Sequence, residues 1–120
     1  MKVLIVEADP DLGDIWARHL RRQGSDVRQA HTQEAAILEL QSHNFDVIVL
    51  DLVLGEGSAL AVADFASYRT PDTQVIFVTD TTFFSDGSIF AHSANACAYV
   101  QSDTAPEDLA AIVEHYGAAK

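Results

Sequence analysis

Short apolar runs and segments of helical period alternate along this chain, and this alternation restricts its fold more than any other feature. The five apolar runs cover residues 2–6, 26–30, 45–50, 74–78 and 97–100. Continuous apolar strands are typical of a parallel sheet with helices packed on both faces. The sequence therefore predicts an α/β fold in which the run at 45–50 is the central strand and the weak run at 26–30 lies at an edge.

Helix-boundary signals follow each apolar run, so five helices are expected. The first has Asp9 as its N-cap and Pro10 in its first turn, and Gly24 is placed to end it in the left-handed conformation. The others are expected to begin at Thr32, at Leu60, near Ser85 or Asp86 (with Asn95 as a C-cap), and after Thr104, the last running to about Tyr116.

Length and composition favour one globular domain over residues 1–120. The chain is 48% hydrophobic, yet no apolar run approaches the roughly 18 residues that a membrane helix needs. The N-terminus does not resemble a signal peptide, which predicts a cytoplasmic protein. A formal charge of −11 repels phosphate backbones and anionic lipids, so neither nucleic acid nor a membrane is an expected partner.

Polar residues stand at the carboxyl ends of the predicted strands, where open parallel sheets bind their ligands. They are Glu7, Asp51, Thr79 and the pair Gln101–Ser102. Asp51 directly follows the most apolar run of the chain. A crevice with carboxylates from two strands suits Mg²⁺, which takes one or two carboxylates and accepts phosphate oxygens.

These elements and their order resemble the receiver domain of two-component response regulators over nearly the whole chain. The resemblance lies in four segments: residues 4–7 with 9–12, residues 47–52 with Leu54, Gly57 and Leu60, residues 75–79, and residues 98–100. It implies a flavodoxin-like three-layer sandwich with a five-stranded parallel sheet in the order 2-1-3-4-5.

The resemblance also implies a function and a set of site residues. Asp51 would accept a phosphoryl group from a phosphohistidine on a sensor histidine kinase or phosphotransfer protein. Mg²⁺ would be bound at Glu7, Asp51 and Val53. The Thr79 hydroxyl would then follow the new phosphate and Tyr99 would swing inward, because an added phosphate can bias a bistable loop. A downstream effector protein would receive the signal, and no catalysis beyond self-phosphorylation is expected.

Two departures from the family pattern weaken the expected site. Ala8 stands where the family has a second acid that binds the metal, and Ser102 stands where it has a lysine. The proline that usually follows this lysine is Asp103, and Asp80 replaces a small residue. Because one carboxylate is missing, the site is expected to bind Mg²⁺ weakly. Because the cation is missing too, Asp51 is expected to be phosphorylated slowly or not at all.

Two other functions are compatible with the same fold. One is a receiver-like module that signals without phosphate, by docking or by forming a homodimer through its fourth and fifth helices. The other is a flavodoxin-like cofactor enzyme, whose phosphate site requires hydroxyls and backbone N–H groups after the first strand. Residues 7–11 read Glu-Ala-Asp-Pro-Asp and offer three carboxylates there instead, so the enzyme is disfavoured.

Overall fold

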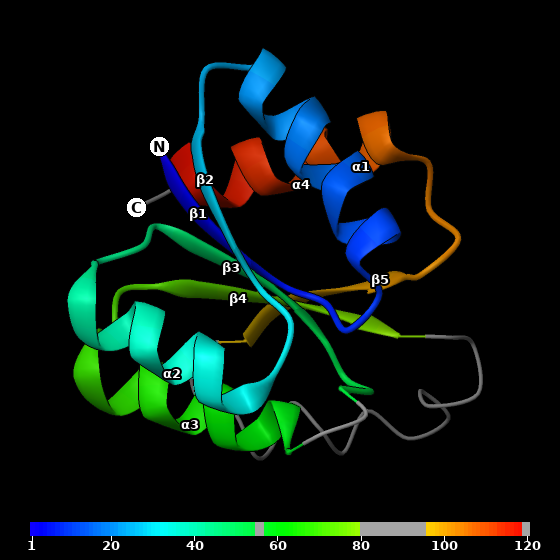
Figure 1. The fold of residues 1–120 in the computed structure, drawn as a ribbon. Coiled ribbons are helices and arrows are strands. Elements are labelled where there is room, and N and C mark those ends of the chain that lie inside the picture. Colours follow the sequence, from blue (N-terminus) through cyan, green and yellow to red (C-terminus); the bar gives the residue numbers. More distant parts are fainter. Residues whose placement is uncertain (55–56, 80–95, 119–120) are drawn as a thin grey trace.

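The computed structural model of the protein describes residues 1–54, 57–79 and 96–118, and in them a five-stranded parallel sheet forms the middle layer (Figure 1). The strand order β2-β1-β3-β4-β5 confirms the predicted topology, with β3 at the centre and β2 at an edge. The strands are β1 Lys2–Val6, β2 Asp26–Ala30, β3 Val47–Asp51, β4 Gln74–Thr79 and β5 Ala96–Gln101.

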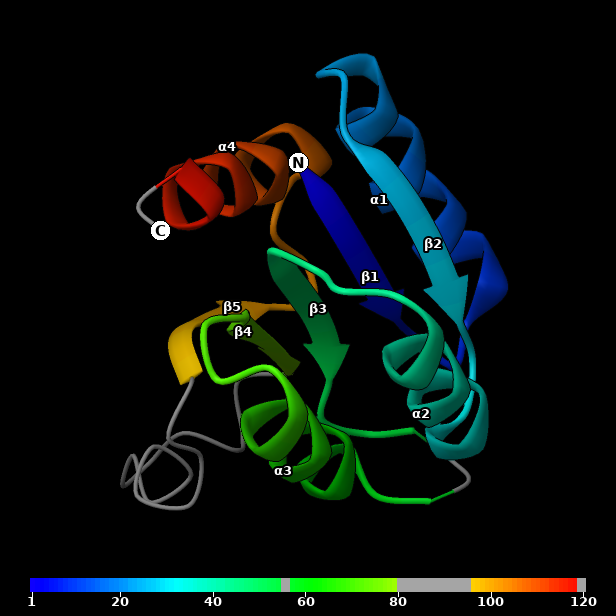
Figure 2. The same ribbon diagram turned by 90° about the vertical axis from the view of Figure 1, so that its left-hand side faces the viewer.

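Helices cover both faces of the sheet. The described helices are α1 Pro10–Arg22, α2 Gln33–Ser42, α3 Ala59–Arg69 and α4 Pro106–Ala118. Helices α1 and α4 pack on one face, and α2 and α3 pack on the other (Figures 1 and 2). The described part of the chain thus has four helices where five were predicted. The helix expected near Ser85, with its C-cap at Asn95, falls outside the described residues.

Side-chain caps fix where the helices begin, largely as predicted. The Asp9 carboxylate accepts a hydrogen bond from the Asp11 N–H at 3.0 Å, and Thr32 Oγ1 accepts one from the Ala35 N–H at 3.1 Å. Each bond satisfies an N–H group that lacks a partner within its helix. At the other end of α1, Gly24 has φ 92°, which confirms the predicted left-handed termination.

Strand β3 begins at Val47, two residues later than its apolar run suggests. Asp46 interrupts this run, and its carboxylate accepts a hydrogen bond from the Lys2 N–H at 2.8 Å. Thr73 Oγ1 donates to the Phe45 carbonyl at 2.7 Å. The Asp46 backbone also bonds to both neighbours, since its N–H donates to the Lys2 carbonyl at 2.8 Å and its carbonyl accepts from the Gln74 N–H at 3.0 Å. Residues 45 and 46 are therefore attached to the sheet just before the regular strand, with Phe45 buried in the core.

The hydrophobic core consists of two clusters, one on each face of the sheet. Strand side chains alternate between the two faces, so neighbouring residues belong to different clusters. Leu4, Ile48 and Phe77 pack toward α2 and α3, whereas Ile5 and Val49 pack toward α1 and α4. We call the latter the α1-side cluster. Among the described residues no helix is long and apolar enough to cross a membrane.

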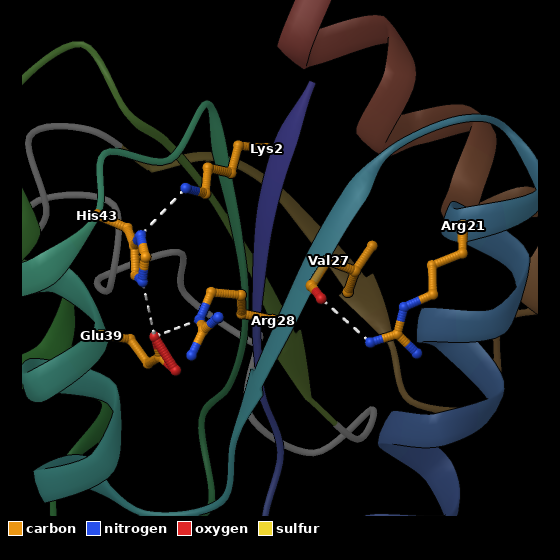
Figure 3. Close-up of polar contacts among 6 residues, drawn as sticks. All are labelled: Lys2, Arg21, Val27, Arg28, Glu39 and His43. Atoms are coloured by element: carbon orange, nitrogen blue, oxygen red, sulfur yellow. Dashed lines mark hydrogen bonds and ion pairs between the residues drawn. The ribbon is translucent and has the colours of Figure 1, made fainter.

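Basic side chains hold together the end of the sheet at which the strands begin (Figure 3). Lys2 Nζ lies 3.1 Å from His43 Nδ1, and His43 Nε2 lies 3.8 Å from the Glu39 carboxylate, which also pairs with Arg28. Arg21 donates to the Val27 carbonyl at 3.1 Å and so attaches α1 to β2. These cations therefore serve elements away from the carboxyl ends of β1 and β3.

Gly24 provides a test of how α1 ends. Space is not limiting, because no atom lies within 4 Å of the position that a Cβ would take. Gly24→Ala should therefore lower the free energy of unfolding by about 1 kcal/mol through the left-handed backbone alone. Gly24→Asn should cost less, since asparagine tolerates this conformation. Urea denaturation measures both, and an alanine variant as stable as the wild type would contradict this account of the turn.

Candidate functional site

The sheet register brings Glu7 and Asp51 together at the carboxyl edge. Val6 is paired with Leu50 across β1 and β3, so the next residues along these two strands, Glu7 and Asp51, are neighbours. Residues two positions earlier, Ile5 and Val49, belong to the α1-side cluster. Alternation therefore directs both carboxylates to the α1 side of the sheet. The convergence of acids predicted from the strand ends is present in the structure.

Glu7 is a buried carboxyl group with an incomplete set of hydrogen bonds. Glu7 is only 4% exposed to solvent. Oε1 accepts a bond from the Asp9 N–H at 3.3 Å, but Oε2 is buried and has no hydrogen-bond partner among the described residues. Burial, together with the neighbouring Asp51 carboxyl, raises the pKa of Glu7 from 4.5 to about 8. Either a proton or a cation is therefore favourable here.

Asp51 is held in a defined orientation by its own loop. The side chain is partly buried at the end of β3, and Oδ1 accepts a hydrogen bond from the Val53 N–H at 2.9 Å. This Asx-type contact fixes the carboxylate relative to the backbone that follows it. A partly exposed carboxylate of fixed orientation, next to a buried acid, can act as a nucleophile or as a metal ligand.

The residues present fit a weakly held divalent cation. Glu7 and Asp51 supply two carboxylates, and Val53 can contribute only its main-chain carbonyl. Ala8 offers a methyl group, and the Asp9 carboxylate caps α1. Among the described residues no group of three or more His, Cys, Asp or Glu side chains is placed to hold a metal ion. Mg²⁺ is compatible with two carboxylates because it retains several waters. Metal binding at Glu7, Asp51 and Val53 stays a prediction.

Thr79 and Tyr99 lie on neighbouring strands beyond Asp51. Thr79 is 1% exposed and stands one residue past Val78, the partner of Asp51 in the sheet. The Tyr99 ring stacks on Phe77, with 5.5 Å between ring centroids and 21° between planes. Its hydroxyl oxygen is buried, and this burial raises the pKa of Tyr99. Tyr99 is thus packed inward against the core on the α2 and α3 side.

The sequence has no lysine or arginine directly after β4 or β5. Ser102 stands directly after β5, and its N–H donates to the Thr79 carbonyl at 2.7 Å. Asp103 follows it and is exposed. The sequence contains no lysine or arginine between Arg69 and Lys120. The loops after β4 and β5 therefore cannot supply a lysine or arginine to neutralise a phosphoryl group.

Sequence reasoning missed three residues that lie near Glu7. Gln29 of β2 has a buried amide oxygen on the α1 side, and Gly13 of α1 faces both Gln29 and Glu7. His31 also approaches, with Nδ1 2.9 Å from the Glu7 carbonyl oxygen. The available signal was the alternation along β2, which places the polar Gln29 on the same covered face as Val27.

Comparison with known proteins identifies related chains. The family of response regulator receiver domains matches residues 3–114. Response regulator protein PilR of Pseudomonas aeruginosa is 32% identical over 78 residues, which make up 65% of this chain and only 18% of PilR. The N-terminal domain of a response regulator/sensory box/GGDEF three-domain protein from Carboxydothermus hydrogenoformans has a TM-score of 0.87 at 27% identity, covering 99% of this chain and 95% of that one.

A second related structure carries a modified residue. It is a response regulator protein from Burkholderia pseudomallei with a phosphorylated aspartic acid, a calcium ion and citrate. The TM-score is 0.83 at 24% identity, and the match covers 98% of this chain and 69% of that one. At this level of identity the comparison establishes a common fold.

The raised pKa of Glu7 predicts how stability depends on pH without divalent cations. Protonated Glu7 stabilises the folded state fully below about pH 4.5, and this contribution is lost as the pH rises toward 8. The wild type should therefore lose stability relative to Glu7→Gln over this range, with a slope of at most about 1.4 kcal/mol per pH unit.

Urea denaturation in EDTA at several pH values measures the difference between the two proteins. Glu114→Gln, at an exposed position of α4, is the matched control and should follow the wild type. A difference between wild type and Glu7→Gln that is constant with pH would contradict the raised pKa.

Proposed function

Because this chain belongs to the family of response regulator receiver domains, we propose that it accepts a phosphoryl group on Asp51 in a two-component phosphorelay. The donor would be a phosphohistidine of a sensor histidine kinase or a phosphotransfer protein. The observation that carries the proposal is the position of Asp51, at the end of the central strand and next to the buried carboxyl of Glu7.

The transfer requires little chemistry from the protein beyond positioning. A carboxylate oxygen of Asp51 attacks phosphorus, the bond from phosphorus to the histidine nitrogen breaks, and the nitrogen keeps the electron pair and takes up a proton. The product is an aspartyl phosphate. The hydrogen bond from the Val53 N–H to Asp51 Oδ1 would orient the carboxylate for this attack. Bound Mg²⁺ would supply positive charge between the carboxylates and the phosphoryl oxygens.

The same residues explain why phosphorylation should be slow and metal affinity low. A charge pair about 4 Å apart contributes on the order of 4 kcal/mol at an effective dielectric near 20, before desolvation is counted. Ala8 removes one such pair with the metal, and Ser102 removes one with the phosphoryl group. Ser102 can donate a neutral hydrogen bond but provides no charge.

Thr79 and Tyr99 are the proposed switch residues. The aspartyl phosphate would add negative charge and strong acceptor oxygens close to the end of β4. The Thr79 hydroxyl, one residue past the sheet partner of Asp51, could donate to such an oxygen. Tyr99 lies two residues before Gln101, which is the sheet partner of Thr79. A change at Thr79 would thus reach β5 and the surface that a downstream effector protein reads.

A second candidate is a receiver-like interaction module that works without phosphate. The packing of Tyr99 favours it, because the ring already stacks on Phe77 in the inward position that the switch would reach. Such a module would dock on a partner or form a homodimer through α4 and the helix expected near Ser85. In either role we place the protein in the cytoplasm. Its formal charge of −11 repels phosphate backbones and anionic lipids, so we expect it to bind neither nucleic acid nor membranes.

Beryllofluoride, a phosphoryl analogue, distinguishes the two candidates. With millimolar Mg²⁺ it should bind at Asp51 and shift the backbone amide signals of Thr79 and Tyr99 in an NMR titration. Asp51→Asn, which lacks the accepting carboxylate, should show no shift. Unchanged amide signals in the wild type at saturating analogue would reject the phosphoacceptor and favour the phosphate-independent module.

The two departures at Ala8 and Ser102 can be reversed together. Ala8→Asp with Ser102→Lys adds one carboxylate for the metal and one cation for the phosphoryl group. This double variant should bind beryllofluoride at least about 10-fold more tightly, since preorganised charges of this kind contribute several kcal/mol. The same titration measures the gain. An unchanged affinity would mean that these two positions do not face the site.

A further inference from the structure

Gln29 places a second buried acceptor on the α1 side of the sheet, near the Glu7 side chain. Its Oε1 atom is buried and, like Glu7 Oε2, has no hydrogen-bond partner among the described residues. Val27, two residues earlier on β2, packs in the α1-side cluster, and alternation directs Gln29 to the same face. Glu7 is on this face too, because Ile5, two residues earlier, packs in the same cluster, and Glu7 Cβ lies near Gly13 of α1. Two buried acceptors thus lie under α1 with no donor assigned to either.

Gly13 leaves space on the side of α1 that faces both side chains. A Cβ at Gly13 would lie 3.2 Å from Gln29 Oε1, 3.6 Å from Glu7 Cβ and 3.9 Å from Glu7 Cγ. Gly13 is a buried residue inside α1, where glycine is less favourable to the helix than alanine. The glycine is explained if the space above it is needed by Gln29 and Glu7.

When Glu7 is ionised, as it is when a cation is bound, a half-turn of the Gln29 amide removes the conflict between the two acceptors. A glutamine amide has an acceptor at one end and two N–H donors at the other, and the two ends occupy nearly the same volume. With its N–H groups turned toward Glu7, Gln29 provides the donor that Oε2 lacks. Gln29 as a whole is only partly buried, so its oxygen can turn toward the solvent.

We propose that Gln29 is a positioning residue whose side-chain amide, in the space left by Gly13, donates to the Glu7 carboxylate and holds it beside Asp51 for a divalent cation. The role in cation binding rests on the proposed phosphoacceptor function, whereas the contact itself does not. Carboxylates that bind metals are commonly oriented by such outer hydrogen bonds, whose loss lowers metal affinity by about 10- to 100-fold.

The contact is tested first in metal-free protein by NMR of the glutamine side-chain NH₂ groups. A donor bound to Glu7 should give a Gln29 signal that exchanges slowly with water, and Glu7→Met should move it and speed its exchange. The side-chain signal of Gln74, at the opposite end of the sheet, serves as the internal control. A Gln29 signal that exchanges freely and does not respond to Glu7→Met would overturn the proposal.

The effect on the cation is tested by Mg²⁺ titration of variants. Gln29→Met keeps the length of the side chain and removes the donor, and Gly13→Ala fills the space. Each should weaken Mg²⁺ binding by about 10-fold. Gln74→Met, the same substitution away from the site, should bind like the wild type. In a Glu7→Met background, Gln29→Met should have no further effect, which distinguishes positioning of Glu7 from a general loss of structure.

The NMR experiment and the Mg²⁺ titration together distinguish failure of this proposal from failure of the proposed function. If wild type binds Mg²⁺ and Gln29→Met binds it equally well, Gln29 does not position Glu7 for the cation. An equal loss with and without Glu7 would also reject the role. If NMR shows that Gln29 contacts Glu7 but the wild type does not bind Mg²⁺ at all, the contact is supported. The role of Gln29 in cation binding is then rejected, and so is the proposed phosphoacceptor function.

Discussion

The close approach of two carboxyl groups, Glu7 and Asp51, is the constraint on which the rest of this molecule depends. The parallel pairing of β1 with β3 brings them together, and alternation points both toward α1. Two carboxylates in a partly dry crevice repel each other unless a proton or a cation lies nearby. In the metal-free protein, burial and then the neighbouring Asp51 carboxyl raise the pKa of Glu7. A site built in this way favours any ligand that brings positive charge between the two groups.

Much of the fold could be predicted because local signals and global packing agree. The apolar runs, the caps at Asp9 and Thr32, and the left-handed Gly24 all occur where the sequence places them. Glu7 and Asp51 were identifiable as well, since parallel strands present their carboxyl ends at one edge. The start of the central strand was predicted less exactly: the run that begins at Phe45 becomes a regular strand only at Val47, although backbone bonds already join Asp46 to Lys2 and Gln74.

The parts of the site that could not be predicted depend on contacts between elements distant in the sequence. Gly13 looks like an unfavourable residue in a helix until Gln29 and Glu7 are seen beneath it. The inward packing of Tyr99 depends on the register that sets it beside Phe77. The resemblance to receiver domains implied a Tyr99 that moves, and gave no information on where the ring rests.

The distribution of charge gives this receiver domain its particular character. Its described cations serve other elements: Lys2 and Arg28 join a network at the opposite end of the sheet, and Arg69 binds carbonyls at the end of α2. None of these three serves the phosphoryl position, where Ser102 stands. The scarcity of charge near Ser102 and the inward packing of Tyr99 are the basis for the proposal that phosphorylation is slow or weak.

The central claim is that Asp51 still accepts a phosphoryl group despite this loss of charge. Intact-mass spectrometry after incubation with a small phosphodonor such as acetyl phosphate and Mg²⁺ tests it directly. The account predicts a slow gain of the mass of one phosphoryl group in the wild type and no gain in Asp51→Asn. No gain in the wild type at any Mg²⁺ concentration, or an equal gain in Asp51→Asn, would contradict it.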